Sequence, residues 1–178
     1  MPDTTALQVR TLAEADLAAY KVLRDHVLAH HAEAFTSDAA TEATRTAQSY
    51  SARLGSSAND TDADGFSLGA WRGDRLVGAI TCERDPRSKV RHVGHIVGMM
   101  VTTDEQGQGV GRALLAALIE RASADAELHQ LTLSVTASNE RAVRMYERAG
   151  FTRYGTLPRA IRVAGRFFDK QLMQLNLQ

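Results

Sequence analysis

The stretch Gln106-Gly107-Gln108-Gly109-Val110-Gly111 decides the fold, because it joins two elements of different kinds. Before it, the run from Val90 to Thr102 becomes apolar toward its end, which is typical of a strand buried on both faces. After it, apolar residues recur at helical spacing from Val110 to Ala122. Glycines let the backbone approach an anion closely, and the first turn of a helix offers unpaired N–H groups. The stretch therefore predicts an anion cradle built from the amides of residues 108–112, with added charge from Arg112.

Two familiar phosphate-binding loops do not match this stretch. A Walker A loop needs Lys and Ser or Thr after its last glycine, but Gly111 is followed by Arg112 and Ala113. A Rossmann fingerprint needs the spacing Gly-x-Gly-x-x-Gly, whereas Gly107, Gly109 and Gly111 are evenly spaced. The glycines alone also fit a connector that only packs the helix against the strand.

The segments before the glycine stretch predict two helices, a loop and a hairpin. A capping box at Thr11 to Glu14 predicts the start of the first helix, and a weaker helix is expected within Ala39–Leu54. The polar residues Gly55 to Gly65 predict a loop. Strand patterns then cover Phe66–Trp71 and Leu76–Cys82, which we expect to form a hairpin around Gly73 and Asp74.

The segments after the stretch predict a further strand, a helix and two final strands. Leu131–Val135 is strand-like, Ser138-Asn139 offers a helix cap, and Gly150 is expected to end that helix in a left-handed conformation. Two last strands are expected between Arg153 and Leu177, around a turn at Ala164-Gly165. The order of elements predicts an α+β fold with a mixed sheet. Without a repeat or linker, residues 1–178 are expected to form a single domain.

Composition excludes several classes of protein. The 21 basic residues balance the 21 acidic ones, so no global field attracts nucleic acid or an anionic membrane. No apolar run reaches the roughly 18 residues that span a bilayer, and Met1–Arg10 lacks the pattern of a signal peptide. Cys82 is the only cysteine, which fits a reducing cytoplasm, and its apolar surroundings favour an inert buried thiol over a nucleophile. No Cys/His cluster has metal-ligand spacing, so we expect no metal.

A second informative block runs from Leu133 to Phe151 with the sequence LSVTASNERAVRMYERAGF. Taken alone, Asn139 fits a helix cap. Tyr146 alone fits a core aromatic residue with a satisfied hydroxyl.

The two blocks together resemble the GNAT superfamily of N-acetyltransferases. Gln106-x-x-Gly109-x-Gly111 matches its signature of Gln or Arg, two residues, Gly, one residue, and Gly or Ala. The resemblance is tight over about residues 66–170 and loose over the first 65. It implies an α/β/α layered fold with a mixed, mostly antiparallel seven-stranded sheet and about four helices. Residues 1–65 would form a helical acceptor side, and residues 66–178 the sheet and the CoA-binding core.

The resemblance also implies the donor and the site residues. The donor is acetyl-CoA, with no metal, and Asn139 would contact its arm while Tyr146 protonates the departing thiolate. The strand end at Met99, Met100 and Val101 would pair with the pantetheine amides. The pyrophosphate would lie on Gln106, Gly107, Gln108, Gly109, Val110, Gly111 and Arg112.

The base that deprotonates the amine is expected to be His95, six residues before Val101. The histone-acetylating branch of the superfamily has a Glu at the matching place, and imidazole titrates closest to neutral pH. A histidine satisfied within the sheet fits equally well. His92 and Glu83 are alternatives, as is a chain of water molecules.

The acceptor is expected to be a small-molecule amine or a peptide amine. The aspartates of the loop at residues 60, 62 and 64 would attract a cationic amine, although a solvated loop also explains them. Arg159, Arg162 and Arg166 would instead favour an acceptor that carries a carboxylate.

Two other classes of function stay open at this point. One is a non-catalytic acyl-CoA-binding or regulatory module, and the other is a structural protein whose glycines only pack. A homodimer is expected only because dimers are common in the resembled family.

Overall fold

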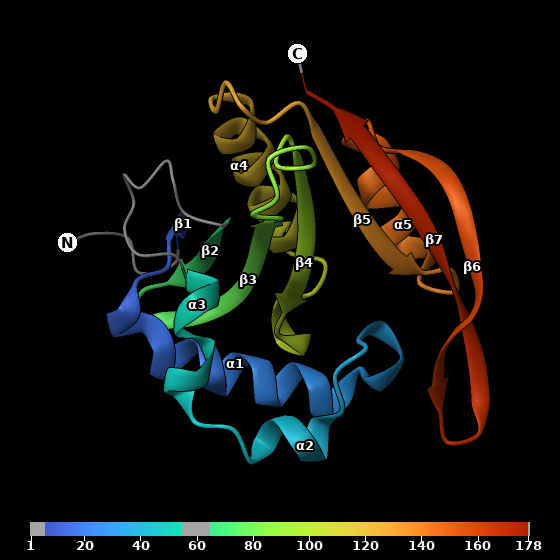
Figure 1. Ribbon diagram of the computed structural model, residues 1–178. Helices are drawn as coiled ribbons and strands as arrows, with labels where there is room; N and C mark the ends of the chain where they lie inside the picture. The colour runs from blue at the N-terminus through green and yellow to red at the C-terminus, as the bar shows by residue number, and fades with distance from the viewer. Residues whose placement is uncertain (1–5, 55–64, 178) are drawn as a thin grey trace.

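The computed structural model describes residues 6–54 and 65–177. Seven strands form one sheet in the order β1-β2-β3-β4-β5-β7-β6 (Figure 1). All neighbouring strands are antiparallel except β4 and β5, which are parallel. The expected mixed, mostly antiparallel sheet is confirmed. The strands are β1 (Leu7–Thr11), β2 (Gly65–Arg72), β3 (Arg75–Arg84), β4 (Val93–Val101), β5 (Gln130–Thr136), β6 (Thr152–Val163) and β7 (Arg166–Asn176).

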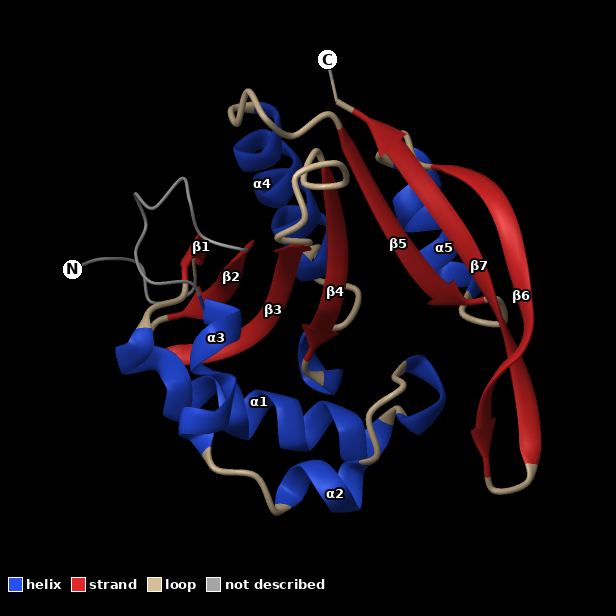
Figure 2. Ribbon diagram, in the orientation of Figure 1, coloured by secondary structure: helices blue, strands red, loops and turns tan. Residues whose placement is uncertain are grey.

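Helices cover both faces of the sheet (Figure 2). On one face lie α1 (Leu17–His30), α2 (Ala39–Ala43) and α3 (Ser51–Leu54), and on the other lie α4 (Val110–Ser123) and α5 (Glu140–Arg148). Short 3-10 turns join them at η1 (Glu14–Asp16), η2 (Ala32–Ala34), η3 (Ala47–Tyr50) and η4 (Thr103–Glu105).

Each face of the sheet has its own hydrophobic core. Leu114, Leu115 and Leu118 of α4 pack with strand residues such as Leu131 on one side. Tyr20 and other residues of α1 pack with a second cluster on the other side. Because β2 and β3 contribute to both cores, their apolar runs are continuous rather than alternating.

The sheet opens between β4 and β5. Their ladder runs from Val93 opposite Gln130 to Ile96 opposite Leu133 and then stops, although both strands continue. Gly98, just beyond the last pair, has φ of +60°, where the register of β3 and β4 also shifts. The two strands therefore diverge, and Figure 1 shows them spreading apart toward their C-terminal ends.

Several local predictions are confirmed. β2 and β3 form the expected hairpin, with Gly73 in a left-handed conformation. Asn139 caps α5, since its side-chain oxygen accepts a hydrogen bond of 3.1 Å from the backbone N–H of Ala142. Gly150 has φ of +95° after the end of α5, as expected for a left-handed cap.

The capping box predicted at Thr11 is wrong. Thr11 ends β1, where it pairs with Leu68, and its hydroxyl accepts a hydrogen bond from Arg121. The turn before α1 is instead stabilised by Asp16, whose carboxylate accepts from the backbone N–H of Ala13 at 2.9 Å. The sequence pattern does not predict this strand, β1, which completes the seven strands of the sheet.

The helix expected within Ala39–Leu54 is present only in pieces. It is divided into α2, η3 and α3. Hydroxyl groups compete for the backbone here: Thr44 donates to the carbonyl of Thr41, and Ser49 donates to the carbonyl of Thr46. The acidic residues of the predicted loop, Asp60, Asp62 and Asp64, lie outside the described residues.

Candidate active site

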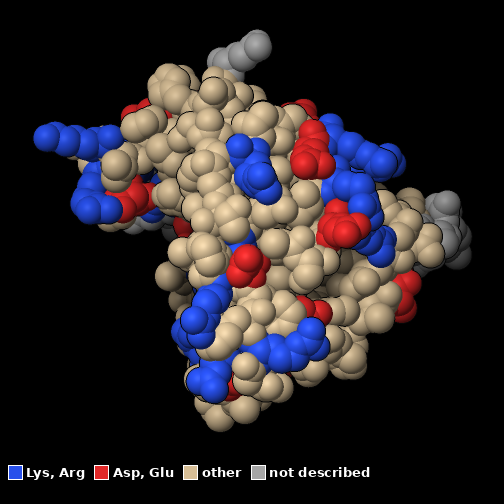
Figure 3. Space-filling model, turned by 90° about the vertical axis from the view of Figure 1, so that its right-hand side faces the viewer, with Lys and Arg blue, Asp and Glu red and all other residues tan. Residues whose placement is uncertain are grey.

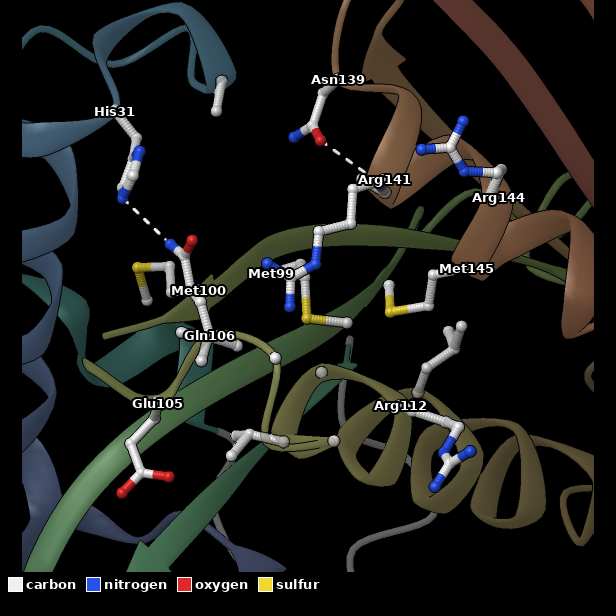
Figure 4. A pocket seen from close by; sticks show the side chains of 18 of the residues that line it. His31, Met99, Met100, Glu105, Gln106, Arg112, Asn139, Arg141, Arg144 and Met145 are labelled. Carbon is white, nitrogen blue, oxygen red and sulfur yellow. Dashed lines mark hydrogen bonds between the residues drawn. The ribbon is translucent and has the colours of Figure 1, made fainter. Parts of the chain in front are cut away.

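A cavity of about 1270 Å³ lies beside the glycine stretch. The end of β4, the glycine stretch and the first turns of α4 form one side of it, and α5 and the segment after α1 form the others (Figure 4). The structure brings all the residues predicted to bind acetyl-CoA to this one cavity. They are Met99, Met100, Val101, Gln106, Gly107, Gln108, Gly109, Val110, Gly111, Arg112 and Asn139.

The glycines are needed for the shape of the cavity. Gly107 and Gly109 have φ of +91° and +83°, a backbone region in which residues other than glycine are strained. A Cβ atom on Gly111 would lie 3.3 Å from the sulfur of Met145 on α5. The glycines therefore leave the backbone N–H groups that face the cavity uncovered by side chains.

The start of α4 supplies unsatisfied donors. Within the described residues, the backbone N–H groups of Gly109, Val110, Gly111 and Arg112 make no backbone hydrogen bond, and the first one is made by Ala113 to the carbonyl of Gly109. Free N–H groups at a helix start, together with the helix dipole, bind anions. This geometry suits a phosphate or diphosphate group.

Basic side chains of α5 also surround the cavity, and the sequence analysis missed them. Arg141, Arg144 and Arg148 line it together with Arg112 of α4 (Figure 4). Arg144 pairs with Glu140 at 2.9 Å, whereas the others form no ion pair within the described part of the chain. The helical spacing of the α5 arginines could have revealed this face, because residues three and four apart lie on one side of a helix.

Gln106 connects the glycine stretch to the end of α1. Its amide nitrogen lies 3.1 Å from Nε2 of His31 (Figure 4). The segment from His31 to Phe35 lines the same cavity, and Thr136 at the end of β5 donates to the carbonyl of Glu33 at 2.7 Å. This contact joins residues far apart in the chain, so no local pattern predicts it.

Tyr146 is buried under the wall of the cavity rather than in its lining. Its ring packs edge-on against Phe151 at 5.8 Å, while its neighbours Met145 and Ala149 line the cavity. Burial raises the pKa of the Tyr146 phenol, which keeps it protonated at neutral pH. Its role as the acid stays a prediction.

His95 lies on β4, exposed and outside the lining of the cavity. Its Nδ1 is 2.7 Å from the hydroxyl of Thr132, and it pairs across the ladder with Glu83. His92 and Glu83 are likewise outside the lining. By contrast, His31 does line the cavity. The role of His95 as the base stays a prediction.

Other features bear on the chemistry. Burial raises the pKa of the Cys82 thiol to about 12, so it is a neutral packing group. Residues 6–54 and 65–177 contain no cluster of side chains able to hold a metal ion. In the same ranges, no helix is long and apolar enough to cross a membrane.

Comparisons with known proteins agree with this geometry. The model of the acetyltransferase (GNAT) family matches residues 25–151, well over half of the chain. An L-methionine sulfoximine/L-methionine sulfone acetyltransferase of Pseudomonas aeruginosa is 39% identical over 77 residues. That match covers 43% of this chain and 44% of the relative, so the two are alike over less than half of their lengths.

Solved structures show the same fold over nearly the whole chain. An acetyltransferase of the GNAT family from Streptococcus pneumoniae has a TM-score of 0.84 at 23% identity, covering 97% of this chain and all of that one (100%). The protein yncA of Salmonella typhimurium, solved with acetyl-CoA, has a TM-score of 0.78 at 23% identity and covers 98% of this chain and 95% of that one. The extent of the family match, on top of a shared fold and a glycine-lined cavity at the start of α4, shows that the chain belongs to the acetyltransferase (GNAT) family.

Proposed function

We propose that the protein is an N-acetyltransferase that moves an acetyl group from acetyl-CoA to a primary amine by direct attack on the thioester. The observation that carries this proposal is the group of free N–H donors at the start of α4, which open into the same cavity as the divergent end of β4. A diphosphate and an attached arm need these two features side by side. A non-catalytic acyl-CoA-binding module is the alternative.

The chain would hold the donor along its length. The amides of residues 109–112 and the guanidinium groups of Arg112 and Arg141 would bind the diphosphate. Beyond Ile96 the edge of β4 has lost its β5 partner, so Met99 to Val101 can pair with the amides of the pantetheine arm as an added strand would. The thioester would then lie in the opening between β4 and β5.

The transfer needs a neutral amine, a polarised carbonyl and a proton for the leaving thiolate. A backbone N–H near Met99 to Val101 would stabilise the developing oxyanion. Tyr146 would protonate the thiolate, and His95, on the sheet just before the opening, would take the proton of the amine. Loss of the acidic limb of the pH–rate profile in His95→Gln would support that last role, and an unchanged profile would oppose it.

The compared proteins support this donor and this type of acceptor. The Salmonella structure contains acetyl-CoA, and the Pseudomonas relative is named for acetylating a small amino-acid derivative. We therefore expect a small-molecule or peptide amine as acceptor. A cytoplasmic location, and a homodimer, are further expectations for the whole protein, and light scattering of the purified chain measures the second.

A panel of amines tests the proposal. Free CoA is measured after incubation with acetyl-CoA and amino acids, polyamines, aminoglycosides or peptides, and calorimetry measures acetyl-CoA binding separately. Release of CoA with one class of amine is the expected result. Tight binding of acetyl-CoA without release of CoA would favour the non-catalytic module. Absence of acetyl-CoA binding would exclude both the acetyltransferase and the non-catalytic module.

A further inference from the structure

Three hydroxyl groups line the face of β5 that points away from α4 and α5. Leu131, Leu133 and Val135 are buried in the core beneath those helices. Side chains alternate along a strand, so Thr132, Ser134 and Thr136 project to the opposite face. This face borders the opening between β4 and β5.

Each hydroxyl is bonded to a different element. Thr132 contacts His95 of β4, and Thr136 donates to the carbonyl of Glu33 in η2. Ser134 accepts a hydrogen bond of 3.2 Å from the ammonium group of Lys170 on β7. Leu133 is the last residue of β5 that pairs with β4, so Ser134 and the ammonium group are the first side-chain groups beyond the ladder. The ammonium group of Lys170 therefore lies over β5 beside the opening, and Lys170 and Ser134 are outside the lining of the cavity described above.

Lys170 is a partly buried cation without an acidic partner. It forms no ion pair with any residue that the structure describes, and Glu33, the acidic residue of η2, is exposed and does not reach it. Burial lowers the pKa of its ammonium group. Taking a charge out of water without a counterion is costly, which is why such groups in proteins usually meet an anion.

The hairpin that carries Lys170 is itself cationic. Arg159 and Arg162 stack on Phe167 at 4.0 and 5.6 Å, and Arg166 stacks on Phe168 at 5.6 Å. None of the three arginines forms an ion pair within residues 6–54 and 65–177. Figure 3 shows more basic than acidic side chains at the lower end of this side of the molecule. Because β6 lies against η2, which lines the cavity, this charge borders the path of an acceptor.

We propose that Lys170, held by Ser134, binds the carboxylate of the acceptor, and that the acceptor is therefore an amino acid with a free carboxyl group. This inference rests on the proposed function and narrows it. The stacked arginines draw the anion toward the opening, and Lys170 fixes it beside the thioester. A polyamine or an aminoglycoside would meet repulsion at the same place.

The first test compares acceptors that differ only in the carboxylate. L-Methionine, L-methioninamide and 3-(methylthio)propylamine are assayed for CoA release with the wild type, Lys170→Met and Lys170→Arg. We expect Lys170→Met to raise the KM for L-methionine about 10- to 100-fold, the loss typical of a hydrogen bond to a charged group, with little change in kcat. The KM values for the two uncharged analogues and for acetyl-CoA should stay the same, and Lys170→Arg should restore part of the preference.

Lys89→Met is the matched control, because Lys89 is an exposed lysine in the connection between β3 and β4, which precedes the end of β4 opposite the opening. It should leave every KM unchanged. A purely structural role of Lys170 would instead lower the melting temperature and raise all KM values together. Equal use of L-methionine and its amide by the wild type, or a preference for polyamines, would overturn the inference while leaving the acetyltransferase proposal intact.

The second test needs no turnover. Calorimetry measures the binding of N-acetyl-L-methionine and N-acetyl-L-methioninamide to the wild type saturated with CoA. Tighter binding of the acid, lost in Lys170→Met, supports the carboxylate site even where no amine releases CoA. Equal affinity for the acid and the amide would overturn it.

Discussion

Gly109 and Gly165 share a left-handed backbone but differ in their surroundings. Gly109 has φ of +83° at the start of α4 inside the cavity. Gly165 has φ of +79° in the turn between β6 and β7, and a Cβ there would meet no atom within 4 Å. The two positions allow backbone strain to be separated from the loss of the binding surface.

We predict that Gly109→Ala raises the KM for acetyl-CoA at least tenfold, because its methyl group projects into the anion cradle. Both Gly109→Ala and Gly165→Ala should lower the free energy of unfolding by about 1 kcal/mol, the cost of a left-handed alanine. Denaturation curves and acetyl-CoA titrations measure the two effects. A rise in KM with Gly165→Ala as well would show that backbone strain alone is responsible.

Tyr146→Phe should lower kcat about 100-fold and leave the Kd for acetyl-CoA nearly unchanged, as expected for the loss of a general acid. Its hydroxyl makes no hydrogen bond with the described residues, so the melting temperature should change little. Tyr154→Phe, in an exposed position on β6, is the control and should keep full activity. Unchanged turnover in Tyr146→Phe would defeat the assignment of the acid.

At the residue scale, the sequence predicted Asn139 and the residues of β4 and the glycine stretch that line the cavity, but not the arginines of α5, His31 or Lys170. Gly109 and Asn139 belong to local motifs, because both act at a helix start. His31 and Lys170 have no such motif. Their positions depend on pairings such as β5 with β7, which only the folded chain creates.

At the scale of elements, one buried cluster holds α1, α2 and η3 together. Arg24 of α1 donates to Glu42 of α2 at 2.7 Å, and the hydroxyl of Tyr50 in η3 donates to the same carboxylate at 2.7 Å. Arg24 and Glu42 are only 3% and 6% exposed. Each element is short or irregular, so the cluster rather than helix propensity keeps them in place.

The same cluster predicts a dependence of stability on pH. Burial alone would raise the pKa of Glu42, but the hydrogen bonds from Arg24 and Tyr50 outweigh it and hold the pKa at about 2. A carboxyl whose pKa falls on folding contributes stability above its unfolded pKa of 4.5, and this contribution is lost as the pH falls toward 2.

Glu42→Gln should therefore lower the free energy of unfolding by about 3 kcal/mol at pH 7, since it leaves Arg24 buried without its partner. The difference from the wild type should shrink between pH 4.5 and pH 2, as urea denaturation at several pH values will measure. Glu147→Gln, at an exposed position on α5, should have no effect at any pH. A difference that stays constant down to pH 2 would contradict the role of the ionised carboxylate.

The errors in predicting elements have the same origin. β1 was not recognised because Leu7 and Val9 are only partly buried at the edge of the sheet, and a short edge strand leaves little alternation to read. The composition of residues 39–54 predicts a helix but does not show where it divides, because the contact of Glu42 with Arg24 depends on the folded chain. Tertiary contacts determine both outcomes.

At the scale of the whole molecule, the cavity spans the opening between β4 and β5. The glycine stretch and α4 belong to the part of the chain before β5, whereas Asn139 and Arg141 belong to the part after it. A ligand in the cavity contacts both parts. Binding should therefore stabilise the molecule as a unit.

Acetyl-CoA at 100 times its Kd should stabilise the fold by about 2.7 kcal/mol. For a chain of this size that raises the melting temperature by roughly 5 to 10 °C. Hydrogen exchange should slow in the glycine stretch and at the start of α5 together. Gly109→Ala should show a smaller rise at the same ligand concentration, and an equal rise would place acetyl-CoA elsewhere.

The short ladder between β4 and β5 has a further consequence for how the chain is made. In the described sheet, four residue pairs from Val93 with Gln130 to Ile96 with Leu133 connect β1–β4 to β5–β7. Each group of strands is one continuous stretch of the chain, so ribosomal synthesis completes the first before the second emerges. A cut between Asp125 and Leu128 would divide the protein into two fragments, each with one wall of the cavity. Because acetyl-CoA would contact both fragments, it would favour their association, and binding of acetyl-CoA to the mixed fragments would measure that association.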